Sequence, residues 1–164
     1  MRSRAEQFYY LDTNYLINYL SFKHDLIAKR MSIDRDARTI ANSVVKSLSR
    51  RIKIPFIVIS EAAGKFMEHE INIGIIEVFG DLEIAFLGRE LIADFSSILQ
   101  DLAEMDRRLE PMDCMIAAFS IASPECLGLL TFDSKLIENR AIKNIVEEKY
   151  PGREFLVTSD PRRS

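Results

Sequence analysis

The chain has 164 residues, of which 48% are hydrophobic, and a formal net charge of −3 at pH 7. This length suits one hydrophobic core and is too short for two, so we expect a single domain over residues 1–164, with frayed polar tails at about 1–6 and 159–164. No stretch approaches the roughly 18 apolar residues of a membrane span, and no apolar signal segment precedes the first charges, which predicts a cytoplasmic protein without a membrane partner.

One segment of the chain is basic although the net charge of the whole chain is negative. Residues 29–53 carry eight Lys or Arg side chains against two Asp, a local charge of +6. A solvated helix face explains this segment as well as phosphate contact does. For phosphate contact, the candidate nucleic-acid-binding residues are Arg35, Arg38, Lys46, Arg50 and Arg51.

The first predicted element is a buried strand. Residues 8–11 are aromatic or aliphatic and are followed at once by Asp12-Thr13-Asn14, a sequence typical of a helix start. Asp12 would then lie at the carboxyl end of this strand. From Asp36 to Leu48, apolar residues recur at helical spacing with basic residues between them, which predicts an amphipathic helix with a positive outer side.

A second strand is predicted over Ile54–Ile59, because this run is rich in β-branched residues and has the length of a strand. Ser60 can cap the helix that follows, which would place Glu61 in the first turn of that helix. Residues 84–87 form another short apolar run, bounded by Gly88, and predict a third strand.

The second half of the chain begins with a long predicted helix. Its apolar residues are spaced by four and three positions along one face: Leu91, Phe95, Ile98, Leu102, Met105 and Leu109. Packing on the domain's own sheet is the default explanation of this seam, and a subunit interface is the alternative. Glu110-Pro111 ends the helix and Pro111 suits the opening of the next, so Asp113 falls in a first helical turn.

Two further strands complete the predicted sheet. Residues 127–132 form a buried run with Asp133 just past its end, and residues 155–157 form the last strand. Strands that alternate with helices form βαβ units, so the predicted fold class is α/β, a parallel sheet with helices on both faces. Ligands of such sheets bind outside the carboxyl ends of the strands. Asp12, Glu61 and Asp133 are all predicted to follow such strand ends.

Four carboxylates are therefore candidates for a functional site: Asp12, Glu61, Asp113 and Asp133. Each one alone is more simply explained as a helix cap or as a first-turn acid that complements the helix dipole. Brought together, they could not all stay ionised without a cation, since repulsion would raise their pKa values. Oxygen ligands select hard ions, so Mg²⁺ or Mn²⁺ is expected rather than Zn²⁺. A metal-bound water can attack phosphorus, which predicts phosphodiester hydrolysis.

Four short motifs resemble those of a known family: Tyr10-Leu11-Asp12-Thr13-Asn14, Ser60-Glu61, Asp113-Cys114-Met115-Ile116-Ala117-Ala118 and Leu130-Thr131-Phe132-Asp133. In this order and context they resemble the PIN-domain nucleases, and the chain is similar to the prokaryotic VapC ribonuclease toxins over nearly its whole length. The resemblance implies an α/β/α sandwich with a central parallel sheet of four to five strands, Mg²⁺ or Mn²⁺ as cofactor, and endonucleolytic cleavage of RNA.

The resemblance also implies residue roles and partners. The four carboxylates would be the catalytic metal ligands, with Thr13, Asn14 and Thr131 as polar support. Family members often form homodimers, and the toxins are restrained by a small antitoxin that covers the site. The chain departs from a minimal toxin in the long region between the second strand and Asp113.

Two other functions are open. A receiver domain or a haloacid-dehalogenase-like phosphatase also has acids at strand ends. The phosphatase, however, needs a second aspartate two residues after its nucleophile, where this chain has Asn14, and the receiver needs an acidic pair near the first strand. A non-catalytic PIN-like module that binds RNA or protein is the other alternative, and the presence of four mutually repelling acids argues against it.

Overall fold

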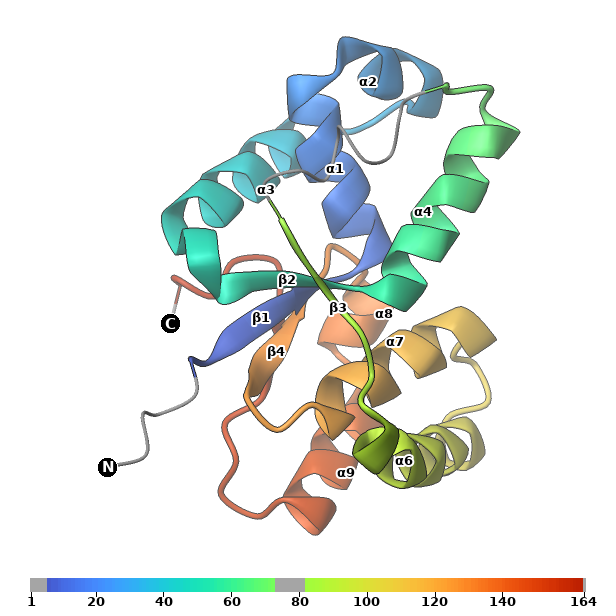
Figure 1. The fold of residues 1–164 in the computed structure, drawn as a ribbon, viewed down its shortest axis with the longest axis vertical. Coiled ribbons are helices and arrows are strands. Elements are labelled where there is room, and N and C mark those ends of the chain that lie inside the picture. Colours follow the sequence, from blue (N-terminus) through green and yellow to red (C-terminus); the bar gives the residue numbers. More distant parts are fainter. Residues whose placement is uncertain (1–5, 73–81, 164) are drawn as a thin grey trace.

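The computed structural model describes residues 6–72 and 82–163. Its centre is a five-stranded, all-parallel sheet in the order β3-β2-β1-β4-β5. The strands are β1 Phe8–Leu11, β2 Ile52–Pro55, β3 Glu83–Ala85, β4 Cys126–Leu130 and β5 Leu156–Thr158. Helices cover the sheet on both faces (Figure 1), so the predicted three-layer α/β/α sandwich is confirmed.

The helices divide between the two faces of the sheet (Figure 1). One layer contains α1 Thr13–Lys23, α2 Asp25–Met31, α3 Arg35–Leu48 and α4 Phe56–Glu68. The other layer contains α6 Ile92–Met105, α7 Pro111–Ala122 and α9 Arg140–Lys149. The short elements are α8 Ser134–Ile137 and the 3-10 turns η1 Ser49–Arg51 and η2 Arg89–Leu91.

The central strands β1 and β4 are buried along their whole length. Helices on both faces leave no solvated side, so these strands are almost continuously apolar rather than alternating. Gly128 is required where β4 pairs with β5, because a Cβ there would overlap the backbone carbonyl oxygen of Leu156. The buried strands give the ends of β1 and β4 fixed positions, and the candidate acids follow these ends.

The second strand ends earlier than predicted. β2 stops at Pro55 and α4 begins at Phe56, so the predicted strand over Ile54–Ile59 is wrong beyond Pro55. Burial of an apolar stripe of α4 against α1 and β2 outweighs the weak β preference of its β-branched residues. Ser60 therefore does not cap the helix, and Glu61 lies in the second turn rather than the first.

The helix predicted over the Leu91–Leu109 seam is also shorter than expected. It runs over Ile92–Met105, and its fully buried residues Ile98 and Leu102 lie on the side that packs against α7 and α9. Met105 at the end of the seam is half-exposed. The buried part of the seam therefore packs within the domain, chiefly against the neighbouring helices α7 and α9.

The C-terminal residues are held in place rather than frayed. The Tyr15 hydroxyl donates to the Ser159 carbonyl oxygen at 2.7 Å. Asp160 is buried and accepts bonds from the guanidinium of Arg162, which also donates to Ser43 Oγ. The predicted frayed tail over 159–164 is thus wrong for these residues, and residues 1–5 of the other predicted tail lie outside the described range.

No helix within residues 6–72 and 82–163 has both the length and the apolar character needed to cross a membrane.

Candidate metal centre

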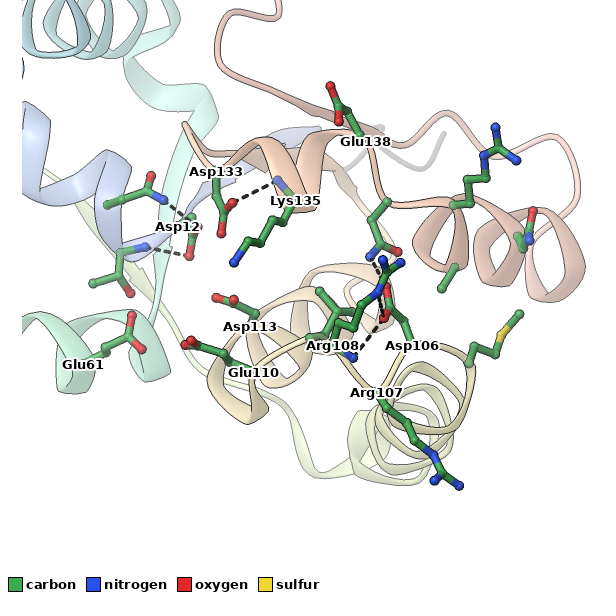
Figure 2. A pocket seen from close by; sticks show the side chains of 18 of the residues that line it. Asp12, Glu61, Asp106, Arg107, Arg108, Glu110, Asp113, Asp133, Lys135 and Glu138 are labelled. Atoms are coloured by element: carbon green, nitrogen blue, oxygen red, sulfur yellow. Dashed lines mark hydrogen bonds and ion pairs between the residues drawn. The ribbon is translucent and has the colours of Figure 1, made fainter.

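One cavity collects the predicted carboxylates. It has a volume of about 970 Å³, and its lining includes Asp12, Glu61, Asp113 and Asp133 (Figure 2). Asp12 follows β1 and caps α1, and Asp133 follows β4 and caps α8. Asp113 lies in the first turn of α7, as predicted, while Glu61 reaches the cavity from the second turn of α4. Four separate elements thus place four acids around one space.

Asp12 is the most enclosed of the four acids, with 3% of its surface exposed. Its Oδ1 accepts a bond from the backbone N–H of Thr13 at 2.8 Å. Its Oδ2 accepts from the Thr131 hydroxyl at 2.8 Å and from the Asn14 amide at 3.3 Å. A carboxylate oxygen has more than one lone pair, so these bonds fix the carboxylate without using all of its acceptor capacity.

Asn14 and Thr131 join the two strand ends to each other. The Asn14 amide donates to Thr131 Oγ1 at 3.2 Å, and the backbone N–H of Phe132 donates to Asn14 Oδ1 at 3.1 Å. The backbone N–H of Asp133 donates to Thr131 Oγ1 at 3.0 Å. The ring of Tyr15 stacks on Phe132 with 4.6 Å between ring centroids. The polar residues predicted as support are therefore bonded to two of the candidate ligands.

The acids of the cavity raise one another's pKa values. Burial raises the pKa of Asp12 to about 6, with added repulsion from Glu61 and Asp133 and opposition from the hydrogen bonds of Thr131 and Thr13. Burial also raises the pKa of Asp113 to about 6, and the charges of Asp12 and Asp133 contribute. Both groups therefore pass from neutral to charged close to neutral pH, where a cation would compete with protons for their oxygens.

The donor set fits a hard cation by its chemistry. Of the described residues that line the cavity, none is His or Cys, so the anionic groups that could bind a cation are carboxylate oxygens. The hydroxyl of Thr13, in the same lining, is buried without a hydrogen-bond partner. Across the described part of the chain, no three Asp, Glu, His or Cys side chains converge as a ready-made metal cluster. Two observations therefore favour a metal: the carboxylate oxygens in the lining, and the raised pKa values of Asp12 and Asp113.

Five basic residues also line the cavity, and the sequence analysis did not select them: Lys65, Arg107, Arg108, Lys135 and Arg140. Lys135 follows Asp133 by two residues, and Arg108 lies three positions before the start of the helix that carries Asp113. Their closeness in sequence to predicted ligands is a signal that could have identified them. Segment 29–53 has a higher local density of positive charge, and the predicted nucleic-acid-binding residues all lie in it.

That basic segment does not reach the carboxylates. None of Arg35, Arg38, Lys46, Arg50 and Arg51 is among the described residues that line the cavity. Arg50 and Arg51 lie in η1, directly before β2, and therefore at the amino edge of the sheet. Lys46 and Arg50 line a separate cavity of about 480 Å³. Arg38 donates to the backbone oxygen of Ser21. The predicted nucleic-acid contacts of this segment are thus not brought together with the acids.

A scan against protein-family models finds no match for the chain, and a search of curated proteins finds no significant match.

Proposed function

We propose that this chain is a metal-dependent endoribonuclease that hydrolyses RNA phosphodiester bonds with Mg²⁺ or Mn²⁺ held by Asp12, Glu61, Asp113 and Asp133. One observation carries the proposal: four acids from four separate elements line a single cavity at the carboxyl edge of the sheet. The resemblance of the sequence motifs to PIN-domain nucleases supports the same assignment. The parallel α/β/α fold is the one that this family would require.

The chain's own residues supply orientation and charge. Thr131 and Asn14 hold the Asp12 carboxylate, which keeps lone pairs for a cation. A bound Mg²⁺ or Mn²⁺ would lower the pKa of a coordinated water and neutralise charge on the phosphate. Lys65 and Lys135 line the same cavity and can offset the charge of an entering phosphate group. These parts together suit the attack of water on phosphorus.

Asn14 separates this proposal from a phosphatase of the haloacid-dehalogenase type. It occupies the place of that enzyme's second aspartate, and its amide is engaged with Asp12, Thr131 and the backbone N–H of Phe132. A general acid is needed at this position, and an amide held in three hydrogen bonds cannot act as one. The contacts of Asn14 therefore favour a supporting role.

Cleavage of a labelled RNA tests the proposal. The purified protein is incubated with single-stranded RNA and Mn²⁺ or Mg²⁺, with an EDTA control. We expect Asp12→Asn, Asp113→Asn and Glu61→Gln each to lower the rate by about 100-fold or more, because loss of metal charge stabilisation is worth several kcal/mol. Circular dichroism checks that each variant is folded.

Glu68→Gln is the matched control for Glu61→Gln. Glu68 lies on the same helix, is exposed, and is not among the described residues that line the cavity. Its variant should cleave as the wild type does. Full activity of Asp12→Asn or Asp113→Asn, in preparations free of contaminating nuclease, would refute the mechanism.

The resemblance extends the proposal to partners, namely a second copy of the chain in a homodimer and a small antitoxin that covers the site. Light scattering of the purified protein tests the dimer. Induced expression in bacteria tests the toxin: growth should stop with the wild-type chain and continue with Asp12→Asn. Normal growth with a soluble, active wild-type chain would contradict a toxin role while leaving the nuclease intact.

A further inference from the structure

Figure 2 shows Arg107 and Arg108 in the part of the cavity that lies away from Asp12 and Glu61, and Lys135 between them and the acids. We call Arg107, Arg108, Lys135 and Arg140 the basic cluster. Arg107 and Arg108 come from the segment between α6 and α7, Lys135 from α8, and Arg140 from the first residue of α9. Residues far apart in the sequence thus supply positive charge to one wall of the cavity.

Asp106 joins two of these segments. Its Oδ1 accepts from the backbone N–H of Arg108 at 3.0 Å and from Arg108 Nε at 3.4 Å. Its Oδ2 accepts from the Asn139 amide at 3.0 Å, and Asn139 Oδ1 caps α9 by accepting from the backbone N–H of Ile142. Asp106 is therefore a positioning residue, since it ties the Arg107-Arg108 segment to the start of α9 beside Arg140.

The cations of the cluster are available to a ligand. Among the described residues, no carboxylate forms an ion pair with Arg107, Lys135 or Arg140, and all three side chains are exposed. Arg108 pairs with Asp106, but its side chain is 93% exposed, and exposed pairs of this kind contribute little to stability. Seven carboxylates are also among the described lining residues, so the cavity is not positive as a whole. With a cation held by the acids, the exposed cations without an ion-pair partner favour an anionic ligand.

Lys135 connects the basic cluster to the acids. Its backbone N–H donates to Asp133 Oδ1 at 2.9 Å, and its side chain points toward the space between Asp133 and Asp113 in Figure 2. A phosphate held by cations bound to the acids would have Lys135 as a direct neighbour. The next phosphates of the same strand would then meet the arginines.

We propose that the basic cluster binds the phosphates that flank the scissile bond of the RNA strand that is cut, with Lys135 nearest that bond. This inference rests on the proposed nuclease function. Arg108 and Arg140 bind the backbone and do not read bases, because phosphate contacts carry no sequence information.

Fluorescence anisotropy of a fluorescein-labelled ten-nucleotide oligouridylate tests binding by the basic cluster. The titrations are done in EDTA, which prevents cleavage, over a series of KCl concentrations. Arg108→Gln and Arg140→Gln should each weaken binding by about 3- to 10-fold. Each should also reduce the slope of log K against log[KCl] by about 0.7, the value for one phosphate contact in a single strand. Lys143→Gln is the matched control, because Lys143 is exposed one turn further along α9 and is not in the described lining of the cavity.

Steady-state cleavage with Mn²⁺ then separates binding from chemistry. Arg108→Gln and Arg140→Gln should raise KM by about the same factor as Kd and leave kcat within about two-fold. If the oligonucleotide binds the variants and the wild type with the same Kd and salt slope, the basic cluster is not the phosphate site, whether or not the protein cleaves RNA. If binding weakens as expected but no RNA is cleaved, the cluster is supported and the nuclease function fails.

Discussion

Replacing Asp12 by Asn is expected to stabilise the metal-free protein and to abolish cleavage. The pKa of Asp12 is raised from 3.8 to about 6, mainly by burial, which corresponds to about 3 kcal/mol of destabilisation when the carboxyl is ionised. Asn keeps the cap on α1, because its amide oxygen caps as well as a carboxylate does. It loses the Oδ2 acceptor of the Thr131 hydroxyl and of the Asn14 amide, which costs about 2 kcal/mol. The net gain at pH 7.5 is about 1 kcal/mol.

The same perturbed pKa sets a pH dependence. Because the pKa of Asp12 is higher in the folded than in the unfolded chain, the folded state binds more protons, and the free energy of unfolding falls as the pH rises from about 4 to about 6. Asp113, whose pKa is also about 6, acts in the same direction. The Asp12 contribution between pH 5 and pH 7.5 is a fall of about 1.4 kcal/mol, and the Asp12→Asn protein lacks it.

Urea unfolding in EDTA, followed by circular dichroism at pH 5 and pH 7.5, measures both effects. Asp36→Asn, at an exposed position in the first turn of α3, is the control and should keep the wild-type pH dependence. Mn²⁺ should raise the unfolding midpoint of the wild type more than that of Asp12→Asn. The reasoning fails if Asp12→Asn is no more stable than the wild type at pH 7.5, or if both lose the same stability between the two pH values.

Two further substitutions test the support of the site and of the sheet. Thr131→Val removes the hydroxyl between Asp12 and Asn14 and should lower the cleavage rate by about 10- to 100-fold, as loss of a group that orients a ligand does. Thr131→Ser keeps the hydroxyl and should retain most of the activity. An unchanged rate in Thr131→Val would show that the hydroxyl is dispensable. Gly128→Ala places a Cβ against the Leu156 carbonyl oxygen and should destabilise the fold by more than about 3 kcal/mol, whereas Gly64→Ala, with open space around its Cβ, should be neutral or slightly stabilising in urea unfolding.

The sequence predicts those parts of the site that depend on buried strands. Phe8–Leu11 is a short aromatic and aliphatic run followed at once by a helix start, so the strand and the position of Asp12 at its end follow from the local sequence. Pro111 marks the start of α7 and places Asp113 correctly, because proline suits a first helical position and lacks only a donor that is unpaired there. Local rules suffice at these positions because tertiary packing agrees with them.

Glu61 shows where local rules fail. The run after Pro55 is rich in β-branched residues, yet it forms a helix because one stripe of its residues is buried against α1 and β2. Val58, Ala62 and Phe66 are spaced by four, and this spacing was the available signal for a helix. Glu61 still reaches the cavity, because the error shifts its place within the helix without changing the edge of the sheet from which the helix starts.

The positive wall of the cavity could not be predicted from local charge. Segment 29–53 is the most basic stretch, but Arg50 and Arg51 lie at the amino edge of the sheet. Arg108 and Arg140 are 32 positions apart and come together only because Asp106 and Asn139 bond across the segments that carry them. Such a cluster is a property of the tertiary fold and leaves no periodic pattern in the sequence.

The separation of charge within the cavity is itself an argument for a ligand. Asp12, Asp113 and Asp133 share the cavity with Lys135 and the nearby arginines. Ion pairs between these groups would lower the pKa values that burial and repulsion raise, yet among the described residues none joins them. Stability alone gives no reason to keep the two sets apart. A cation bound to the acids and RNA phosphates bound to the bases would neutralise both sets of charges at once. The Asp12→Asn protein tests cation binding by the acids, and the Arg108→Gln protein tests phosphate binding by the bases.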